Sequence, residues 1–370
     1  EPQYAGERTL LVDNCLTALQ QLANYHRRRL KTPLIGITGT NGKTTTKELI
    51  ATVLQQKFRT LYTQGNFNNH IGVPLTLLQL TPEHEIAVVE MGANHPGEIN
   101  TLVRIAEPDY GIITNVGKAH LEGFGSFEGV IRTKGELYDY LREKGNGTVF
   151  IQHENPYLNP IAHGLNCIPY GQQGGHICGQ LLSCSPYLHF QWHEEGKESH
   201  EVQTHLIGSY NLDNALAAVA IGTYFGVPAA AICKALSDYV PQNNRSQLKE
   251  TGRNHLIVDA YNANPTSMMA ALTNFRQMEV SPKMAILGDM KELGDSSLEE
   301  HQKIADYLQT CDFETVLLVG PEFGKTSTPF RHFPDTASLI HFLEEQTVDG
   351  KYILIKGSNS MKLSQLSDLL

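Results

Sequence analysis

Residues 34–45 read LIGITGTNGKTT, a short apolar run followed directly by a glycine-rich loop. Behind the loop, apolar residues at positions 49, 50, 53 and 54 recur on one face of a predicted helix. A loop between a strand and a helix presents backbone N–H groups and a helix N-terminus to an anion, and a lysine and a hydroxyl add a charge and a ligand for Mg²⁺. We therefore expect a nucleotide triphosphate to be bound by Gly39, Thr40, Asn41, Gly42, Lys43, Thr44 and Thr45.

The loop departs from the general phosphate-loop pattern by one residue. That pattern places a glycine six positions before the lysine, where this chain has Ile37, and Gly36 comes one position too early. A plain glycine turn with a surface lysine is therefore an alternative, although the strand and helix around the loop favour the phosphate site.

Strands and helices alternate on both sides of this loop. Strands are predicted near 86–90, 110–114 and 148–151, and helices near 14–30, 97–106 and 127–141. This order predicts an α/β fold with a mostly parallel sheet covered by helices.

A different pattern begins after residue 170. Residues 171–206 alternate apolar and polar side chains, which predicts a small antiparallel meander. Five histidines fall within 176–205, yet His189 and His193 would lie about 13 Å apart on a strand and cannot share a zinc ion. We expect them to be solvated strand residues.

The last third of the chain predicts a second α/β unit. Two helices are expected in 209–238, and Pro241-Gln242-Asn243-Asn244 is a polar, helix-breaking joint. Apolar strands separated by helical stretches follow at 256–260, 285–287, 316–319 and 353–355. We expect a lead-in helix in 1–31, a central ATP-binding domain in 32–241 and a C-terminal domain in 242–370.

Composition excludes several classes of protein. The 370 residues carry 39 acids and 29 bases, and this net charge of −10 argues against a broad nucleic-acid surface. Six cysteines without a C-x-x-C pair indicate reduced thiols and a cytoplasmic protein. The uncharged run 214–233 is alanine-rich and broken by glycine and proline, so we expect packed helices and no membrane insertion.

The short loop read as 38–45, TGTNGKTT, resembles the ATP loop of the Mur ligases, which build the peptidoglycan precursor. Residues 114–122 and 208–214 resemble two further signatures of that family's central domain. Four segments resemble its MurF branch, the D-alanyl-D-alanine-adding ligases: 65–72, 90–95, 259–265 and 287–294.

This resemblance implies a P-loop ATPase domain followed by a Rossmann-like C-terminal domain. It implies an ATP- and Mg²⁺-dependent, ADP-forming ligase that converts the terminal carboxylate of UDP-N-acetylmuramoyl-tripeptide to an acyl phosphate, which D-alanyl-D-alanine then attacks. The partners would be small molecules, and we expect a monomer. Family members also carry an N-terminal UDP-binding domain, so residues 1–31 are expected to be the remnant that follows a missing one.

The resemblance also assigns site residues. Glu90 and Asp259 each end a predicted strand, at the edge where open α/β sheets bind ligands. Mg²⁺ would be held by Thr44, Glu90, His120 and Lys134, with His120 as a ligand of a second ion and Lys134 as a carbamate. The catalytic residues would be Lys43, Lys134, His120 and Arg245. The nucleotide would also contact Asn214, Arg245 and Asp259. The peptide substrate would contact Asn68, Asn69, Lys356 and Ser358.

Each assignment has a structural alternative. Glu90 could cap a helix, Arg245 could be a linker residue, and nothing in the sequence itself distinguishes Lys134 from a surface lysine. Residues 356–361 match the closing motif of the branch except at Asn359, where an arginine is often found, and this weakens the assignment of the motif to the peptide substrate. Two other functions stay open: a folylpolyglutamate synthetase-like ligase, and a nucleotide-binding fragment without turnover.

Overall fold

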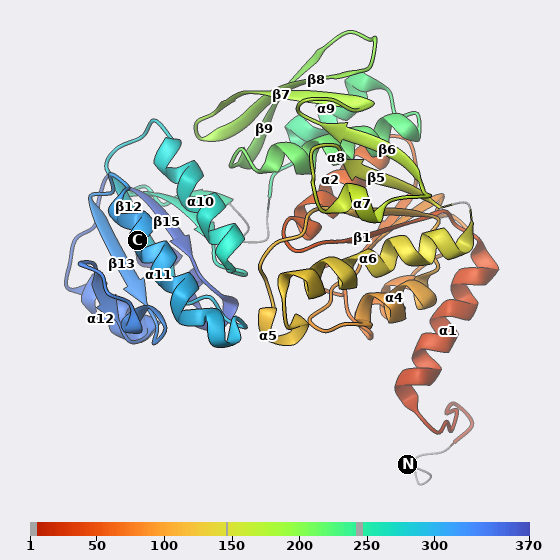
Figure 1. Ribbon diagram of the computed structural model, residues 1–370, viewed down its shortest axis with the longest axis horizontal. Helices are drawn as coiled ribbons and strands as arrows, with labels where there is room; N and C mark the ends of the chain where they lie inside the picture. Colours follow the sequence, from red (N-terminus) through yellow and green to blue (C-terminus); the bar gives the residue numbers. More distant parts are fainter. Residues whose placement is uncertain (1–5, 146, 242–246) are drawn as a thin grey trace.

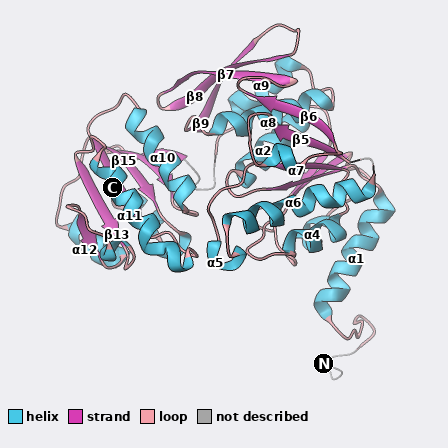
Figure 2. Cartoon of the chain, viewed as in Figure 1, coloured by secondary structure: helices cyan, strands magenta, loops and turns pink. Residues whose placement is uncertain are grey.

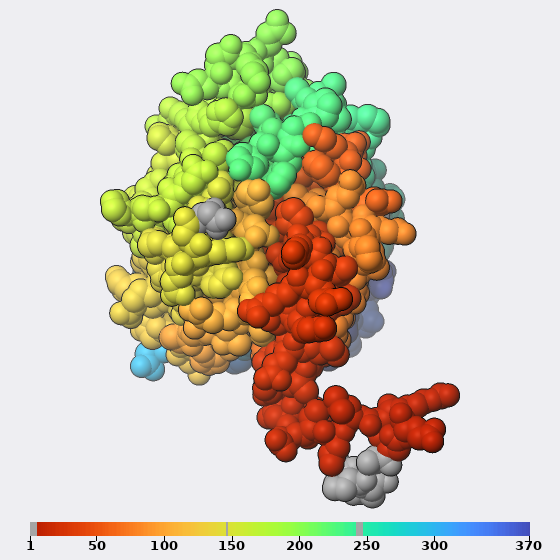
Figure 3. Space-filling model, turned by 90° about the vertical axis from the view of Figure 1, so that its right-hand side faces the viewer, coloured from red at the N-terminus to blue at the C-terminus, as the bar shows by residue number. Residues whose placement is uncertain are grey.

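The structure is a computed structural model that describes residues 6–145, 147–241 and 247–370. Its elements form two lobes, each built on one sheet (Figure 1). Helices flank the strands of both lobes (Figure 2). The expected lead-in helix lies on one face of the first lobe, as the space-filling view shows (Figure 3). It is α1, Cys15–Leu30, and Asn14 caps its N-terminus.

The first lobe contains a nine-stranded sheet. Its order in space is β2 (Thr60–Tyr62), β3 (Ile86–Glu90), β1 (Leu34–Thr38), β4 (Tyr110–Ile113), β5 (Thr148–Gln152), β6 (Asn166–Gly171), β7 (Ile177–Cys184), β8 (Tyr187–Glu194) and β9 (His200–Ile207). Neighbours are parallel from β2 to β7 and antiparallel from β7 to β9. The expected meander is therefore present, and it continues the parallel sheet.

Both faces of this sheet are covered by helices. They are α2 (Lys43–Leu54), α3 (Gly72–Leu77), α4 (Glu98–Ala106), α5 (Leu121–Phe124), α6 (Phe127–Lys144), α7 (Leu158–Ile161), α8 (Asn211–Tyr224) and α9 (Ala229–Asp238). Along β1, Ile35 belongs to the apolar core that includes α2 and α8, while Leu34 belongs to the core that includes α4 and α6. A strand buried on both faces has to be apolar throughout, which accounts for the uninterrupted run at this point of the sequence.

Gly36 has a packing role that explains its position before the loop. A Cβ atom there would lie 3.2–3.3 Å from side-chain atoms of Pro108, Leu137 and Met91. The glycine therefore allows α6 to pack closely on the sheet. In the run 214–233, α8 and α9 are two helices of one core, and no helix of the described residues has the length and apolar character needed to span a bilayer.

The second lobe contains a six-stranded sheet. Its order is β10 (Gln247–Glu250), β11 (His255–Asp259), β15 (Tyr352–Lys356), β12 (Lys283–Gly288), β13 (Thr315–Val319) and β14 (Arg331–Phe333). Only β10 runs antiparallel to its neighbour. The helices are α10 (Pro265–Gln277), α11 (Ser297–Gln309) and α12 (Thr336–Glu344). The mixed α/β fold with a mostly parallel sheet is thus confirmed. Three of the four residues of the polar joint 241–244, which is predicted to be the domain boundary, lie outside the described residues.

Candidate active site

The glycine loop leaves β1 and begins α2 at Gly42. Gly42 adopts φ 77°, and a Cβ atom there would lie 2.6 Å from Oδ1 of Asn214 on α8. Only glycine combines that backbone conformation with so close a neighbour. Asn115, after β4, accepts a hydrogen bond from the backbone N–H of Asn41 at 2.9 Å. The loop therefore has a fixed shape, with the N-terminus of α2 behind it.

Lys43 is folded over this loop. Its Nζ donates to the carbonyl oxygens of Gly39 at 2.7 Å and Thr40 at 2.9 Å. The ammonium group is thereby held beside the backbone N–H groups that would surround a phosphate.

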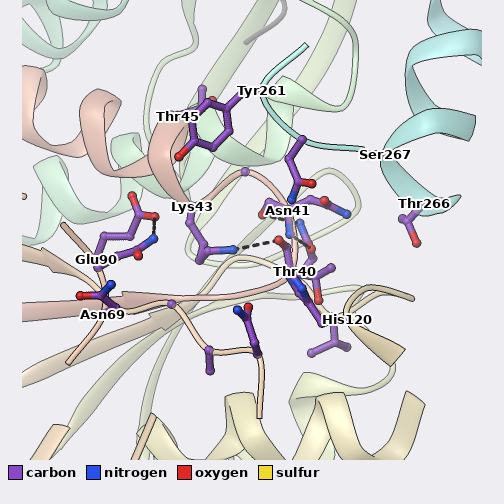
Figure 4. Close-up of a pocket in the computed structure, with 18 of the residues that line it drawn as sticks. Thr40, Asn41, Lys43, Thr45, Asn69, Glu90, His120, Tyr261, Thr266 and Ser267 are labelled. Carbon is purple, nitrogen blue, oxygen red and sulfur yellow. Dashed lines mark hydrogen bonds between the residues drawn. The ribbon is translucent and has the colours of Figure 1, made fainter. Parts of the chain in front are cut away.

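The loop opens into a cavity of about 930 Å³ between the two lobes. The first lobe lines it with the loop, with Glu90 and His120, and with residues at the start of α8. The second lobe contributes the segment after β11 and the start of α10, where Tyr261, Thr266 and Ser267 line the cavity on one side of the loop (Figure 4). The carboxyl ends of strands from both sheets therefore meet at one site, where open α/β sheets bind ligands.

Glu90 ends β3 inside this cavity and is only 1% exposed. Its Oε1 accepts a hydrogen bond from Nδ2 of Asn68 at 2.8 Å. Its Oε2 is buried and has no hydrogen-bond partner among the described atoms. A buried carboxylate oxygen without a donor is costly unless a cation or another donor reaches it. The alternative role of Glu90 as a helix cap has no support, since α4 begins after Gly97 without a side-chain cap.

His120 lies at the start of α5 with a left-handed backbone, φ 50°. Its Nδ1 contacts Oε2 of Glu292, which comes from the second lobe. Burial lowers the pKa of His120, while the Glu292 carboxylate opposes that shift. A neutral imidazole is the form that binds a metal ion.

Lys134 is buried in α6 at 2% exposure, which argues against the alternative of an ordinary surface lysine. Its Nζ donates to the carbonyl of Ala93 at 3.2 Å and lies 5.2 Å from the ring centre of Phe124. Burial and the charge of Lys43 lower its pKa to about 7. A large fraction of this amine is therefore unprotonated near neutral pH.

Comparison with known proteins identifies the family. Residues 37–222 match the model of the Mur ligase middle domain, and residues 244–359 match that of the Mur ligase glutamate ligase domain. A UDP-N-acetylmuramoyl-tripeptide–D-alanyl-D-alanine ligase of Bacillus subtilis is 37% identical over 376 residues, covering 96% of this chain and 80% of that protein. The chain belongs to the Mur ligase family.

Two solved Mur ligase structures share the arrangement of both lobes. MurF of Acinetobacter baumannii is 33% identical with a TM-score of 0.86, covering 97% of this chain and 81% of the other. MurF of Thermotoga maritima, in complex with ADP, is 26% identical with a TM-score of 0.86, covering 98% and 85%. These relatives favour the MurF branch over the folylpolyglutamate synthetase-like alternative, and the chain is an ATP-dependent, ADP-forming ligase.

The other residues assigned from the Mur ligase motifs lie at different distances from the cavity. Thr45, Asn69, Asn214, Asp259 and Lys356 are among its lining residues, whereas Thr44 is 4% exposed and is not. Ser358 also lies outside the lining and accepts a hydrogen bond from the backbone N–H of Lys291 at 3.0 Å. Arg245 lies outside the described residues.

Three asparagines around the loop escaped the assignment from motifs, and two of them, Asn115 and Asn211, line the cavity. Asn115 holds the loop, Asn211 accepts a hydrogen bond from Nδ2 of Asn214 at 2.8 Å, and Asn264 donates to Oδ1 of Asn41 at 2.7 Å. All three stand within the quoted motifs 114–122, 208–214 and 259–265. The signal was therefore present, but which asparagine of each motif faces the loop depends on the packing of the elements.

Proposed function

We propose that this chain joins D-alanyl-D-alanine to the terminal carboxylate of UDP-N-acetylmuramoyl-tripeptide. The observation that carries the proposal is the similarity over 96% of the chain to a ligase with these substrates. The cavity agrees with it, because a phosphate-binding loop, cationic side chains and polar residues of a second lobe surround one space that admits several ligands.

The reaction needs an activated carboxylate, since a carboxylate itself is a poor acylating agent near neutral pH. A carboxylate oxygen attacks the γ-phosphorus of ATP, the bond to the β-phosphate oxygen breaks, and ADP leaves. The amine nitrogen of D-alanyl-D-alanine then attacks the acyl carbon. The phosphate departs with the former carboxylate oxygen, and the nitrogen loses a proton as the amide forms.

Lys43 and the loop carry the first step in this proposal. The loop N–H groups and the N-terminus of α2 bind the phosphates, and the Nζ of Lys43 stabilises charge on the phosphoryl group that is transferred. Asn214 supports the loop from α8, and Thr46 of α2 donates to its Oδ1 at 3.0 Å. Asp259 and Tyr261 are the nucleotide contacts from the second lobe.

The residues present fit a divalent cation. Glu90 offers an unpaired buried oxygen and His120 a ring at the same cavity, and Thr44 and a carbamate on Lys134 are the further ligands we propose. Mg²⁺ usually keeps several waters and phosphate oxygens as ligands, so a small number of protein ligands is enough to bind it. Bound there, Mg²⁺ would neutralise charge on the transferred phosphoryl group.

The surroundings of Lys134 favour a carbamate on its side chain. A protonated Lys134 would repel both Lys43 and the cation, whereas an amine with a pKa of about 7 reacts with carbon dioxide to give an anion. We further propose that the enzyme acts as a monomer in the cytoplasm. The peptide substrates would contact Asn68, Asn69, Lys356 and Ser358.

The test is an omission assay. Phosphate release is measured with ATP, Mg²⁺, UDP-N-acetylmuramoyl-tripeptide and D-alanyl-D-alanine, and then with each component left out in turn. Full release only with all four supports the proposal. Release that continues without D-alanyl-D-alanine but requires another amine would move the chain to another acceptor, and binding of ATP without turnover would make it a nucleotide-binding fragment.

A further inference from the structure

One loop of the second lobe reaches across to the first. Residues 289–294 follow β12, and within them Glu292 adopts a left-handed backbone, φ 64°. Its Oε2 contacts Nδ1 of His120, and its carbonyl accepts a hydrogen bond from the backbone N–H of Glu122 at 3.4 Å. The motif that identified the branch thus meets the motif that contains His120.

The first residue of this loop is anchored in the interior of the second lobe. Asp289 is 0% exposed, and its carboxylate accepts hydrogen bonds from the backbone N–H groups of Glu322 at 3.1 Å and Phe323 at 3.0 Å. A Cβ atom on Gly320 would lie 2.4 Å from the Asp289 carboxyl carbon, so the neighbouring turn is shaped around it.

The next two residues have anchors of their own. The backbone N–H of Met290 donates to Nε2 of the fully buried His301 at 3.0 Å, and that of Lys291 donates to Oγ of Ser358 at 3.0 Å. Three successive residues before Glu292 are therefore held by separate elements. A non-glycine residue in the left-handed region needs such support, and it often marks a functional position.

His120 has its own constraints on the other side of the contact. Its ring packs edge-on against Phe124, with ring centres 6.2 Å apart, and it lines the cavity. Its Nδ1 is buried and forms no hydrogen bond with the described residues. The Glu292 carboxylate is in ion-pair contact with this nitrogen and is therefore placed to decide which ring nitrogen carries the proton.

We propose that Glu292 is a positioning residue for His120. By receiving Nδ1–H, its carboxylate fixes the tautomer and ring orientation that leave Nε2 available to a divalent cation. Metal-binding histidines generally donate their second ring N–H to a carboxylate or carbonyl in this way. The inference rests on the proposed role of His120, and it links metal binding to the contact between lobes, because the two side chains come from different lobes.

A second ion pair across the same contact supplies a matched control. Lys118 pairs with Glu300 of α11 at 3.0 Å, and Glu300 also contacts Lys303 at 3.1 Å. Lys118→Ala therefore weakens the contact between the lobes without touching His120 and without leaving Glu300 unpaired. Glu292 is itself half exposed, so Glu292→Ala should fold.

The experiment measures the metal affinity of the whole chain without turnover. Mn²⁺ is titrated in the presence of saturating ADP and followed by electron paramagnetic resonance, for the wild type, Glu292→Ala, Lys118→Ala, His120→Ala and His120→Ala/Glu292→Ala. We expect Glu292→Ala to raise the Kd for Mn²⁺ about tenfold, Lys118→Ala to leave it unchanged, and Glu292→Ala to add nothing once His120 is gone. In ¹⁵N spectra of the metal-free chain, His120 should carry its proton on Nδ1 in the wild type and lose that preference in Glu292→Ala.

The outcomes separate the inference from the function on which it rests. The positioning role would be overturned by an unchanged Kd for Mn²⁺ in Glu292→Ala, or by an equal rise of that Kd in Lys118→Ala. If the Kd still rises in His120→Ala, the proposed metal site stands. An unchanged Kd in His120→Ala would instead overturn the proposed role of His120 itself.

Discussion

Lys356 and Asp259 form an ion pair of 2.5 Å at the carboxyl ends of two adjacent parallel strands. Lys356 is 1% exposed, and its Nζ also donates to the carbonyl of Asn262 at 3.3 Å. The two residues were assigned separately, one to the peptide substrate and one to the nucleotide. Because the two side chains are paired, the charge of each is balanced by the charge of the other at the edge of the cavity.

This pair gives a prediction on stability. Lys356→Met should lower the free energy of unfolding by about 2 kcal/mol, because it leaves Asp259 without its cation; the loss is below that of a fully buried pair since Asp259 is partly exposed. Urea unfolding of the single variants and of Asp259→Asn/Lys356→Met measures it. The double variant should lose less than the sum of the two, and full additivity would show that the pair has no coupling energy.

For the glycine loop, we predict that Lys43→Ala reduces ATP turnover at least about 100-fold and leaves the fold intact, because its charge faces the cavity and stabilises the transferred phosphoryl group. Phosphate release and circular dichroism check the two parts. Lys57→Ala is the control, since Lys57 donates to the carbonyls of Phe225 and Gly226 and does not line the cavity. If Lys43→Ala turned over ATP at the wild-type rate, the proposed role of the loop in phosphoryl transfer would be wrong.

For the metal site, Glu90→Gln should raise the Mg²⁺ concentration needed for half-maximal activity by about tenfold, since it removes the charge of a buried oxygen that has no other partner among the described atoms. Asn68→Ala should have a smaller effect, because it removes only the donor to Oε1. A Mg²⁺ titration of both variants decides the matter, and identical curves for Glu90→Gln and the wild type would mean that Glu90 is structural.

Lys134 gives a prediction that depends on pH. Because its pKa in the folded state is about 7, below the usual 10.5, the unfolded chain binds more protons between these values, and this residue's contribution to stability rises with pH across that window. The neutral amine should take up ¹³C-labelled carbon dioxide, giving a carbamate signal that grows as the pH rises through about 7. Lys134→Ala should lack the signal and activity, and short carboxylic acids should restore part of the activity. A wild-type spectrum without the signal in the presence of nucleotide and Mg²⁺ would contradict the carbamate.

What the sequence could predict depends on how local each feature is. The strand, loop and helix around Lys43 follow from consecutive residues, and they are where the prediction placed them. The edge strands β10 and β14 escaped prediction because QLKE and RHF are short and carry polar side chains. Such segments pair with a sheet without an apolar run to mark them.

Features that depend on packing escaped prediction for a different reason. Lys134 has the sequence neighbourhood of a surface residue, yet it is buried, with its Nζ at the carbonyl of Ala93 and beside the ring of Phe124. The contact of Glu292 with His120 joins residues that are 172 positions apart and lie in two lobes, and the sequence near either residue does not predict it. Motifs therefore pointed to residues that line one cavity, whereas the contacts between these residues required the structure.

The acyl phosphate is the central claim of this account, and an isotope transfer tests it most directly. UDP-N-acetylmuramoyl-tripeptide labelled with ¹⁸O in both oxygens of its terminal carboxylate is converted by the chain in the presence of ATP, Mg²⁺ and D-alanyl-D-alanine, and the released phosphate is analysed by mass spectrometry. The account predicts that each phosphate carries one ¹⁸O atom, because the oxygen that attacked the γ-phosphorus leaves with it. Released phosphate without ¹⁸O, alongside normal amide formation, would show that the carboxylate is not activated by phosphorylation.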